Sequence, residues 1–485
     1  MPPTGFNLLL SARQEMAHEG FDPDFPPGTD RELAEAKARP LDASGNGVRD
    51  LRPLLWSSID NASSRDLDQV EVAERLPDGG IRLLIGIADV DWAVHRGSTI
   101  DGHAASQTVT VYTAVKIFPV LPPELSTGLT SLNENEDRLA IVIEMAVSSD
   151  GSIASSDIYR ALLQNRAQLG YETAGPWLEG SGAAPPAVAA SADLAAQLRL
   201  QDEAASHLRA RRQSLGALNF DRTETSAVML DGEVKGLTVV AKNRATKLIE
   251  DFMIAANEVM ARTLAQKGMS NIRRVVKSPE RWLRIVQLAA SHGATLPPDP
   301  DSLALAQFLQ SQKEKDAVRY DDLSLAVIKL LGPGEYVLSR PGDPAEGHFG
   351  LAAHDYTHST APNRRFADLV TQRLIKSSLT GSYKPYSDDE LAAIASNCTL
   401  KEDAARKVER TMGKRVAALA FANRKGDQFD AIITGVSPKG VFVRTLNPPV
   451  DGRLMRGESG VDVGDRIRVT LLSTDPERGF IDFAR

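Results

Sequence analysis

Cysteine is almost absent from this sequence. Cys398 is the single thiol among 485 residues, which excludes an intramolecular disulfide framework and a cysteine-rich zinc site. This usage is typical of a reducing compartment, and we predict a cytoplasmic protein. No apolar run is long enough to span a bilayer, and the first twenty residues lack the basic start and cleavage site of a secretory signal. We therefore expect no membrane association.

An excess of positive charge is also missing. The formal net charge is −8 and the sequence pI is near 5.6, which argues weakly against a polyanionic ligand. The distribution argues the other way, because residues 401–425 contain eight Lys or Arg against three acids. Such a tract is consistent with a wall of a nucleic-acid channel, and equally with a solvated helix face.

The composition is that of a folded protein, with 42% hydrophobic and 25% charged residues, and the length suits two to four domains. Residues 1–50 are predicted to be a short extension with two helical stretches, ARQEMAHEGF and DRELAEAKA. Residues 51–425 combine a strand–turn–strand pattern near 69–90, a stretch at 159–170 that could be strand or helix, and long helices. Asn243 is the expected N-cap of one helix, and another covers 388–425 with a break near Asn397. Residues 426–485 contain four or five short β-rich runs, typical of a small barrel. The predicted class is α+β with a C-terminal all-β barrel.

Three aspartates lie within nine residues in SSIDNASSRDLDQVE, namely Asp60, Asp66 and Asp68. Arg65 is the only basic residue of this stretch, which we expect to form a loop before the first hairpin strand. Carboxylates this close repel one another unless a cation lies between them, and hard oxygen ligands suit magnesium or manganese. Paired ions held by shared carboxylates are a common device for phosphodiester cleavage. A calcium-stabilised loop or an exposed acidic turn remains an alternative for these residues alone.

A second group of polar residues lies in GHFGLAAHDYTHSTAPNRRFADLVTQRL, residues 347–374. Arg364 and Arg365 precede a predicted helix and follow small hydroxyl residues such as Thr360. Planar guanidinium groups beside a helix N-terminus are well suited to hold a phosphate, although a structural ion-pair network has the same residues. We interpret His358 as a structural hydrogen-bonding residue.

Taken together, these segments resemble the catalytic (RNB) domain of the ribonuclease II/ribonuclease R family. The run LPPELSTGLTSLNENEDRLA at 121–140 and LIEDFMIAAN at 248–257 are similar to two further family motifs. The last 60 residues, with GVSPKGVFV, resemble the RNA-binding OB-fold barrel first described in a ribosomal protein. The resemblance covers about residues 51–485. It implies an RNB domain of mixed sheet and surrounding helices with an RNA channel, and a hydrolytic, processive 3′→5′ exoribonuclease that releases nucleoside 5′-monophosphates from single-stranded RNA.

The resemblance assigns roles to particular residues. Asp60, Asp66 and Asp68 match the magnesium ligands, with manganese as a possible substitute, and Asp68 matches the least dispensable position. Arg364 matches the arginine that holds the scissile phosphate. Tyr112 and Phe220 match the two sides of an aromatic clamp on the 3′-terminal bases, for which stacking suits every base. Tyr171 and Glu250 match residues near the terminal ribose, which are linked to the choice of RNA over DNA, and Glu409 matches a glutamate on the helix that lines the channel. Arg365, beside Arg364, is a further candidate for contact with RNA. The family also suggests a monomer.

The sequence departs from the family pattern at two places. Gln69 stands where the motif has a fourth aspartate, so the metal site is expected to be one negative charge short. Fewer than 60 residues precede Asp60, and they are predicted to be helical, so we expect no N-terminal cold-shock barrels and a more open channel entrance. Because Gln69 removes one charge from the predicted metal site, a catalytically weak or silent RNA-binding regulator on the same scaffold is an alternative hypothesis. A metal-dependent DNase is a weaker alternative, against which Tyr171 and Glu250 argue.

Overall fold

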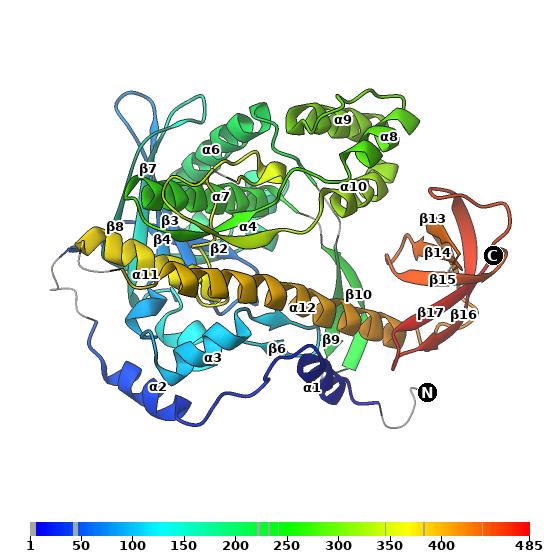
Figure 1. Ribbon diagram of the computed structural model, residues 1–485, viewed down its shortest axis with the longest axis horizontal. Coiled ribbons are helices and arrows are strands. Elements are labelled where there is room, and N and C mark those ends of the chain that lie inside the picture. Colours follow the sequence, from blue (N-terminus) through cyan, green and yellow to red (C-terminus); the bar gives the residue numbers. More distant parts are fainter. Residues whose placement is uncertain are drawn as a thin grey trace.

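The alternating run at 69–88 forms the predicted hairpin in the computed structural model of the chain (Figure 1). Strand β3 (Gln69–Arg75) pairs antiparallel with β4 (Ile81–Ala88) across the PDGG turn, with Gln69 opposite Ile87. The structure describes residues 6–41, 47–220, 224–230, 233–240, 242–344, 346–381, 384–438 and 440–485. The Asp-rich segment is only partly a loop, because Asp60 is the last residue of strand β2 (Trp56–Asp60).

The central sheet has the strand order β1-β8-β2-β3-β4-β7. Strand β8 (Ile153–Gly170), whose type the sequence leaves open, pairs antiparallel with β7 (Asp137–Val147) through its first part and parallel with β2 through its second part. The additional pairing of β8 with β7 closes the sheet on itself. Closure removes two open edges, and it places the end of β2 beside Gly170, the residue before helix α4 (Tyr171–Leu178).

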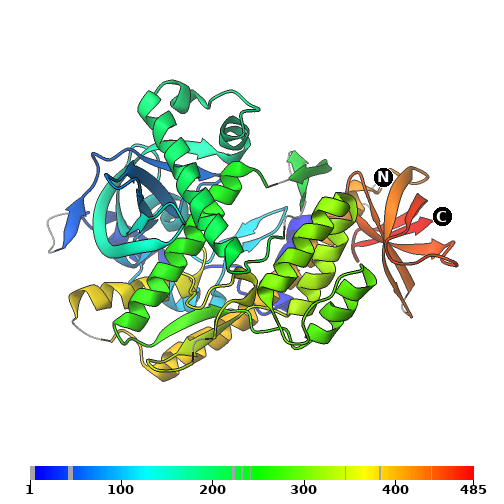
Figure 2. The ribbon, with the colours of Figure 1, turned by 90° about the horizontal axis from the view of Figure 1, so that it is seen from above.

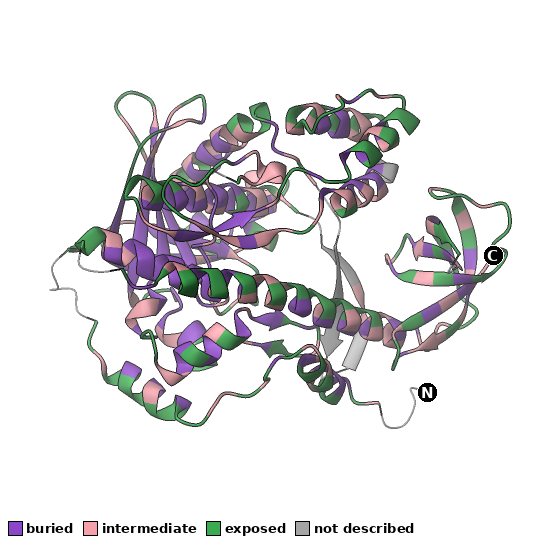
Figure 3. Ribbon diagram, viewed as in Figure 1, coloured by how far each residue is buried: buried purple, intermediate pink, exposed green. Residues whose placement is uncertain are grey.

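Two long helices, α6 (Ala192–Ser214) and α7 (Arg244–Gln266), pack on the sheet and on each other. Asn243 caps α7 as the sequence predicts, since its side chain accepts the N–H of Thr246 and the Thr246 hydroxyl accepts the N–H of Asn243. The apolar stripe of α7, including Leu248 and Phe252, is fully buried. Figure 3 shows that the buried residues concentrate in the sheet, α7 and α11 (Phe366–Thr380).

Helix α12 (Asp388–Ala420) is a single helix of 33 residues, so the predicted break near Asn397 is wrong. The Asn397 side chain does not compete for the backbone of its own helix, because its Nδ2 donates to the carbonyl of Ala105 at 2.8 Å. The helix begins with a capping box of Ser387 and Glu390. In Figure 1 it runs from the central body to the C-terminal barrel.

The C-terminal strands form a closed five-stranded barrel, in the order β13-β14-β15-β17-β16, as the sequence predicts. Its strands are β13 (Gln428–Ser437), β14 (Gly440–Thr445), β15 (Asp451–Arg456), β16 (Arg466–Asp475) and β17 (Phe480–Ala484). Phe421, just after α12, stacks on Phe429 at a ring distance of 5.2 Å, so the barrel core continues into the end of the helix.

The N-terminal region forms the two predicted helices, α1 (Leu8–His18) and α2 (Thr29–Ala38), and α1 packs on α12. A separate apolar cluster joins α8 (Trp282–Ser291), α9 (Ser302–Lys315) and α10 (Ala317–Leu331), which Figure 2 shows between the body and the barrel. The α+β class is confirmed. Among the residues that the structure describes, no helix has the length and apolarity to cross a membrane.

The remaining elements are short or lie at the periphery. They are β1 (Val48–Asp50), α3 (Thr99–Gln107), β5 (Val111–Tyr112), β6 (Ile117–Phe118), α5 (Pro186–Ala189), β9 (Glu224–Leu230), β10 (Glu233–Val240), β11 (Asn271–Val275) and β12 (Glu335–Ser339).

Candidate active site

A cavity of about 360 Å³ lies where β2, β3, α4 and α7 meet the segment before α11. Most of the residues that the sequence analysis selects are in its wall. The lining residues are Asp60, Asn61, Ser64, Asp66, Asp68, Gln69, Tyr112, Tyr171, Ile249, Met253, Thr360, Ala361 and Arg364. The closed sheet brings Asp60 to one side, and the chain reversal before α11 brings Arg364 to the other.

Asp68 is the most buried acid of this wall, with a side chain that is 4% exposed. Its Oδ1 accepts the backbone N–H of Asn363 at 3.0 Å, and its Oδ2 lies 3.7 Å from Nε of Arg364. Burial raises the pKa of Asp68 to about 8, against the opposing effects of Arg364 and the Asn363 N–H. At neutral pH this carboxyl therefore needs additional positive charge nearby to ionise fully.

Asp60 and Asp66 complete the acidic wall. Asp60 Oδ1 accepts the N–H of Asn61 at 2.7 Å and the Ser64 hydroxyl at 3.0 Å. Burial raises the pKa of Asp60, and the charge of Asp66 raises it further. The hydroxyl of Tyr112 donates to Asp66 Oδ2 at 3.2 Å. Protein groups compensate only part of the electrostatic cost of placing these carboxylates together. A bound cation would compensate the remainder.

The donor chemistry of the wall fits a hard divalent cation. Three carboxylates and the amide of Gln69 face one cavity, and the Gln69 Nε2 donates to the carbonyl of Ile59 at 3.3 Å. The amide oxygen is the end of Gln69 that points away from Ile59, and such oxygens are ligands that magnesium accepts. Across the described residues, however, no group of three His, Cys, Asp or Glu side chains is clustered tightly enough to hold an ion as it stands.

Tyr112 and Glu409 form a connection between strand β5 and helix α12. The backbone N–H of Tyr112 donates to Glu409 Oε1 at 3.0 Å, and burial raises the pKa of Glu409. Glu409 therefore fixes the position of Tyr112, whose side chain is 39% exposed and lines the cavity. The ring is accessible for stacking, and its hydroxyl remains linked to Asp66.

Tyr171 begins α4, and its backbone carbonyl accepts Nδ2 of Asn243 at 2.8 Å. The residue that caps α7 thus also holds the start of α4. Burial raises the pKa of the Tyr171 hydroxyl, and the charges of Asp60 and Glu71 raise it further. These charges act on Tyr171 because it lines the same cavity as Asp60.

Four predicted residues lie outside the cavity wall, and Glu409, described above, is one of them. Arg365 makes two bonds to the fully buried Asp368, from Nε at 2.8 Å and from Nη2 at 2.7 Å, and its contact with an RNA phosphate stays a prediction. Phe220 packs against the cluster of α8, α9 and α10. Glu250 is exposed and pairs with Lys242 at 2.8 Å. For Phe220 and Glu250, a contact with RNA stays a prediction.

Sequence reasoning missed two residues of the site. Asn363 supplies the N–H that holds Asp68, and its position just before the arginine pair was the available signal. Glu71 is fully buried on β3, and burial together with the charge of Asp60 raises its pKa well above the ordinary value. An acid between Val70 and Val72 in an otherwise apolar strand was the signal for Glu71.

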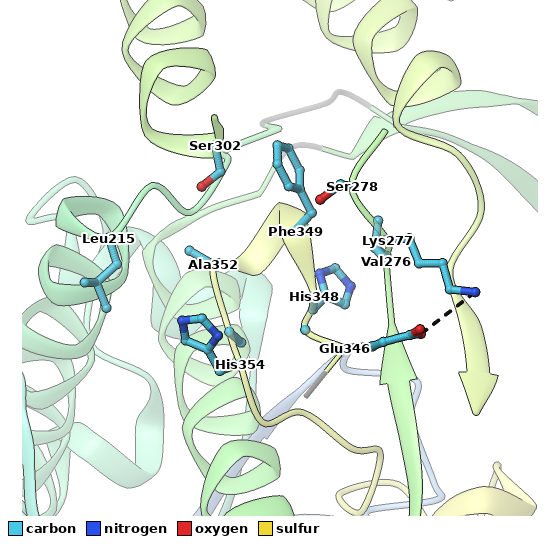
Figure 4. Close-up of a pocket in the computed structure, with 12 residues that line it drawn as sticks. Leu215, Val276, Lys277, Ser278, Ser302, Glu346, His348, Phe349, Ala352 and His354 are labelled. Atoms are coloured by element: carbon cyan, nitrogen blue, oxygen red, sulfur yellow. Dashed lines mark ion pairs between the residues drawn. The ribbon is translucent and has the colours of Figure 1, made fainter. Parts of the chain in front are cut away.

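A second cavity, of about 430 Å³, lies between the central body and the cluster of α8, α9 and α10 (Figure 4). His348, His354 and Phe349 face it, and Lys277 pairs with Glu346 at 3.8 Å at its edge. Burial and the charge of Arg274 lower the pKa of His348 to about 4, so its ring is neutral near pH 7. This cavity contains none of the residues predicted from the sequence.

Comparison with known families matches residues 48–381 to the RNB domain and residues 427–485 to the RNase II-type exonuclease C-terminal S1 domain. Among curated proteins, ribonuclease R of Thermotoga maritima is 28% identical over 95% of this chain and 68% of its own length. Ribonuclease R of Escherichia coli is 28% identical over 95% of this chain and 60% of its own length. Ribonuclease R 1 of Lactococcus lactis is also 28% identical, and the chain spans 58% of it.

Solved structures share the fold. Mycoplasma genitalium RNase R in complex with ribose methylated single-stranded RNA superposes with a TM-score of 0.87 at 22% identity, over 98% of this chain and 78% of that one. Yeast Ssd1, a pseudonuclease, gives a TM-score of 0.69 at 18% identity, over 86% of this chain and 51% of that one. The same fold therefore occurs in a protein named RNase R and in a protein named a pseudonuclease.

Proposed function

The chain belongs to the RNB-domain family, and on that basis we propose that it is a hydrolytic, processive 3′→5′ exoribonuclease that converts single-stranded RNA to nucleoside 5′-monophosphates. One observation carries the proposal. The buried Asp68 and the Arg364 guanidinium, which is 44% exposed, lie 3.7 Å apart in the wall of a cavity that Asp60 and Asp66 also line. Relatives that are named ribonuclease R support it.

The proposed cofactor is magnesium, with manganese as a substitute. Asp60, Asp66 and Asp68 would hold it, with the Gln69 amide oxygen at the fourth position. When bound, the metal would activate the attacking water and stabilise the departing 3′ oxygen. Positive charge at this place also offsets the burial of Asp68 and Asp60, which raises the pKa of both carboxyl groups.

The protein's own groups orient the RNA. The Arg364 guanidinium accommodates two phosphate oxygens and stabilises negative charge as the bond breaks. The Tyr112 ring stacks on a terminal base without selecting its identity, and Glu409 holds the strand that carries it. Tyr171, which lines the cavity at the start of α4, would contact the terminal ribose. Asn363 holds Asp68 in its rotamer from the arginine side of the cavity.

We further propose that the protein acts as a cytoplasmic monomer and that the barrel of β13 to β17 binds the RNA upstream of the cavity. Chains that reach both sites stay bound between successive cleavages, which is the physical basis of processivity. A second candidate function, a silent RNA-binding regulator, is favoured by one observation, the replacement of an acid by Gln69.

The test uses a 5′-labelled single-stranded RNA with the wild-type chain, in magnesium, in manganese and with a chelator. We expect full-length RNA to disappear while a short labelled product accumulates, and we expect no reaction with the chelator or with Asp68→Asn. A DNA of the same sequence should persist. Intact RNA under all conditions, together with tight binding in a gel-shift assay, would instead identify the silent regulator.

A further inference from the structure

A cavity of about 390 Å³ lies on the side of helix α7 that faces away from the acidic wall. Ile249 and Met253 of α7 line the candidate active site, whereas Glu258 and Arg262 of the same helix line this other cavity. Successive residues of a helix are about 100° apart, so the two pairs lie on nearly opposite faces of α7. The helix therefore separates this cavity from the candidate active site.

This cavity adjoins the one of about 430 Å³ in Figure 4, because Leu215, Ala352 and His354 line both. We call the cavity beside α7 the arginine cavity, and the cavity of Figure 4 the aromatic cavity. Each volume is within the range of about 300–1,000 Å³ that is typical of sites for small organic ligands. One ligand with two chemically different halves therefore fits across the pair.

Three arginines lie in the wall of the arginine cavity. Arg212 is paired with the buried Asp251. Arg211 and Arg262 are exposed, and neither makes an ion pair with another residue that the structure describes. Guanidinium groups that line one cavity without a protein partner are suited to an anion, and their planar donors match the oxygens of a phosphate.

The acids around the arginine cavity leave these two charges in excess. Asp355 is bonded to Nη1 of Arg273. Asp150, outside the wall, accepts the N–H and the hydroxyl of Ser152 at 3.0 Å and 2.6 Å. Among the described lining residues, Glu258 is the acid that remains to oppose Arg211 and Arg262, and burial raises its pKa. Positive charge therefore predominates in this cavity.

The aromatic cavity has a different lining. The side chains of Phe349 and His348 face it beside the aliphatic Val276 (Figure 4). His348 Nδ1 accepts the N–H of Leu351 at 3.2 Å, so in the neutral ring the proton is on Nε2. An aromatic face, aliphatic walls and a ring N–H donor suit a flat ligand with acceptor atoms at its edge, such as a nucleobase.

We propose that the two cavities together bind a nucleoside 5′-monophosphate, with the base in the aromatic cavity and the phosphate at Arg211 and Arg262. A nucleotide joins a flat ring with polar edges to an anion, which is the combination that the two linings require. The choice of a nucleoside 5′-monophosphate rests on the proposed function, whose product it is. This product site is separate from the cavity in which the product forms.

The experiment measures the binding of adenosine 5′-monophosphate by titration calorimetry in chelator. It uses the Arg364→Ala chain, whose candidate active site lacks its phosphate-holding arginine. We expect AMP to bind more tightly than adenosine, which lacks the phosphate, and than ribose 5-phosphate, which lacks the base. Adding Arg211→Ala or Arg262→Ala should weaken AMP binding about 10–100-fold, the range of a charged hydrogen bond. Arg284→Ala, on the exposed face of α8 and outside both cavities, is the matched control and should not change it.

A second variant tests the junction of the two cavities. Leu215 lines both and is 52% exposed, so Leu215→Glu should leave the melting temperature unchanged. The added carboxylate lies between the two halves and repels the phosphate, and we expect AMP binding to be lost. Unchanged AMP affinity in the folded Leu215→Glu chain would overturn the inference.

Three further results would overturn it. Equal AMP affinity with and without the substitutions at Arg211 and Arg262 would place AMP elsewhere. Ribose 5-phosphate that binds as tightly as AMP would leave a site for phosphate alone. A short RNA oligonucleotide that displaces AMP at lower concentration would assign the cavities to an RNA strand.

RNA turnover by the wild-type chain separates this failure from that of the proposed function. A chain that degrades RNA but binds no AMP at these cavities would overturn the inference alone. A chain that binds AMP there but leaves RNA intact would overturn the proposed function and retain the nucleotide site.

Discussion

Arg364 and Arg365 are neighbours in the chain with opposite environments. Arg364 projects into the cavity beside Asp68, whereas Arg365 is held by two bonds to the buried Asp368 of α11. Both arginines belong to the same sequence motif, which does not distinguish their environments. Only the turn that begins α11 decides which side chain faces the cavity and which one faces the helix it precedes.

This difference predicts separate effects for two matched substitutions. Arg364→Lys keeps the charge but loses the planar fork, and we expect kcat on RNA to fall about 10²–10³-fold with unchanged stability. Arg365→Lys should leave kcat of the folded protein nearly unchanged and lower the free energy of unfolding by about 1–3 kcal/mol, since it breaks charged hydrogen bonds to a buried acid. Turnover assays and urea unfolding measure the two. An equal loss of kcat in both variants would place Arg365 on the substrate.

His348 predicts a dependence of stability on pH. The pKa of His348 is lowered to about 4 in the folded chain. On acidification, the unfolded chain therefore binds a proton at this histidine near pH 6.5, whereas the folded chain binds it only near pH 4. This contribution to stability is present at pH 7 and is lost as pH falls from about 6.5 towards 4, by about 2 kcal/mol at pH 5.

The measurement is urea unfolding at pH 7.5 and pH 5. His348→Asn keeps an acceptor for the N–H of Leu351, which His348 Nδ1 now accepts at 3.2 Å, and should lose less stability on acidification than the wild type. His18→Asn, on the exposed face of α1, is the control and should behave as the wild type. Identical slopes in all three proteins would contradict the assignment of a neutral buried His348.

The sequence predicts residues well where a motif fixes spacing and poorly where the fold decides orientation. Asp60, Asp66 and Asp68 are close in the chain, so their proximity in space needs no long-range information. Phe220 is placed by the cluster of α8, α9 and α10, which no local pattern reveals. Sequence reasoning missed Glu71 because an acid in a strand is usually exposed. The burial of Glu71 depends on how α6 covers β3.

Among the secondary-structure elements, the confirmed predictions rest on helix caps and on the alternation of apolar and polar residues. Asn243 fixes the start of α7, and the PDGG turn fixes the β3–β4 hairpin. The failures occurred where tertiary contacts override local preference. Asn397 is a poor helix former, yet its bond to the carbonyl of Ala105 stabilises it within α12. Residues 159–170 were ambiguous because YRALLQNRAQLG is rich in Leu, Ala, Gln and Arg, which favour helices, although the run forms part of strand β8.

The connection between α12 and β5 predicts a binding defect. Glu409→Ala removes the acceptor of the Tyr112 N–H and should raise KM for RNA about tenfold with a smaller change in kcat, since a charged hydrogen bond contributes about 1.5–3 kcal/mol. Glu409→Gln keeps an acceptor oxygen and should retain most of the affinity. Steady-state kinetics on single-stranded RNA distinguish the variants. A larger fall in kcat than rise in KM would show that Glu409 acts on the chemistry instead.

For the whole molecule, the separation of barrel and cavity is the relevant feature. Helix α12 has 33 residues and therefore a length of about 50 Å, with the barrel at its C-terminal end. Phe442, on β14, is 40% exposed and stands opposite Arg453 of β15. Stacking on this ring and phosphate contacts by this arginine are the two kinds of RNA contact that an OB-type barrel makes.

We expect Phe442→Ala to weaken the binding of long RNA about tenfold without changing its salt dependence, because stacking releases no counterions. Arg453→Ala should lower the slope of log affinity against log salt by about 0.7. Neither should affect the cleavage of oligonucleotides too short to reach the barrel. Filter binding over a range of salt measures both, and an equal loss on short oligonucleotides would show that the barrel acts through the cavity.

The hydrogen bond between Asn363 and Asp68 joins residues 295 positions apart. During translation, the acidic residues leave the ribosome long before Arg364 is synthesised. A growing chain that is still attached to its own messenger RNA therefore holds only half of the cavity for most of its synthesis. The cavity is therefore complete only after nearly the whole RNB domain, residues 48–381, has emerged.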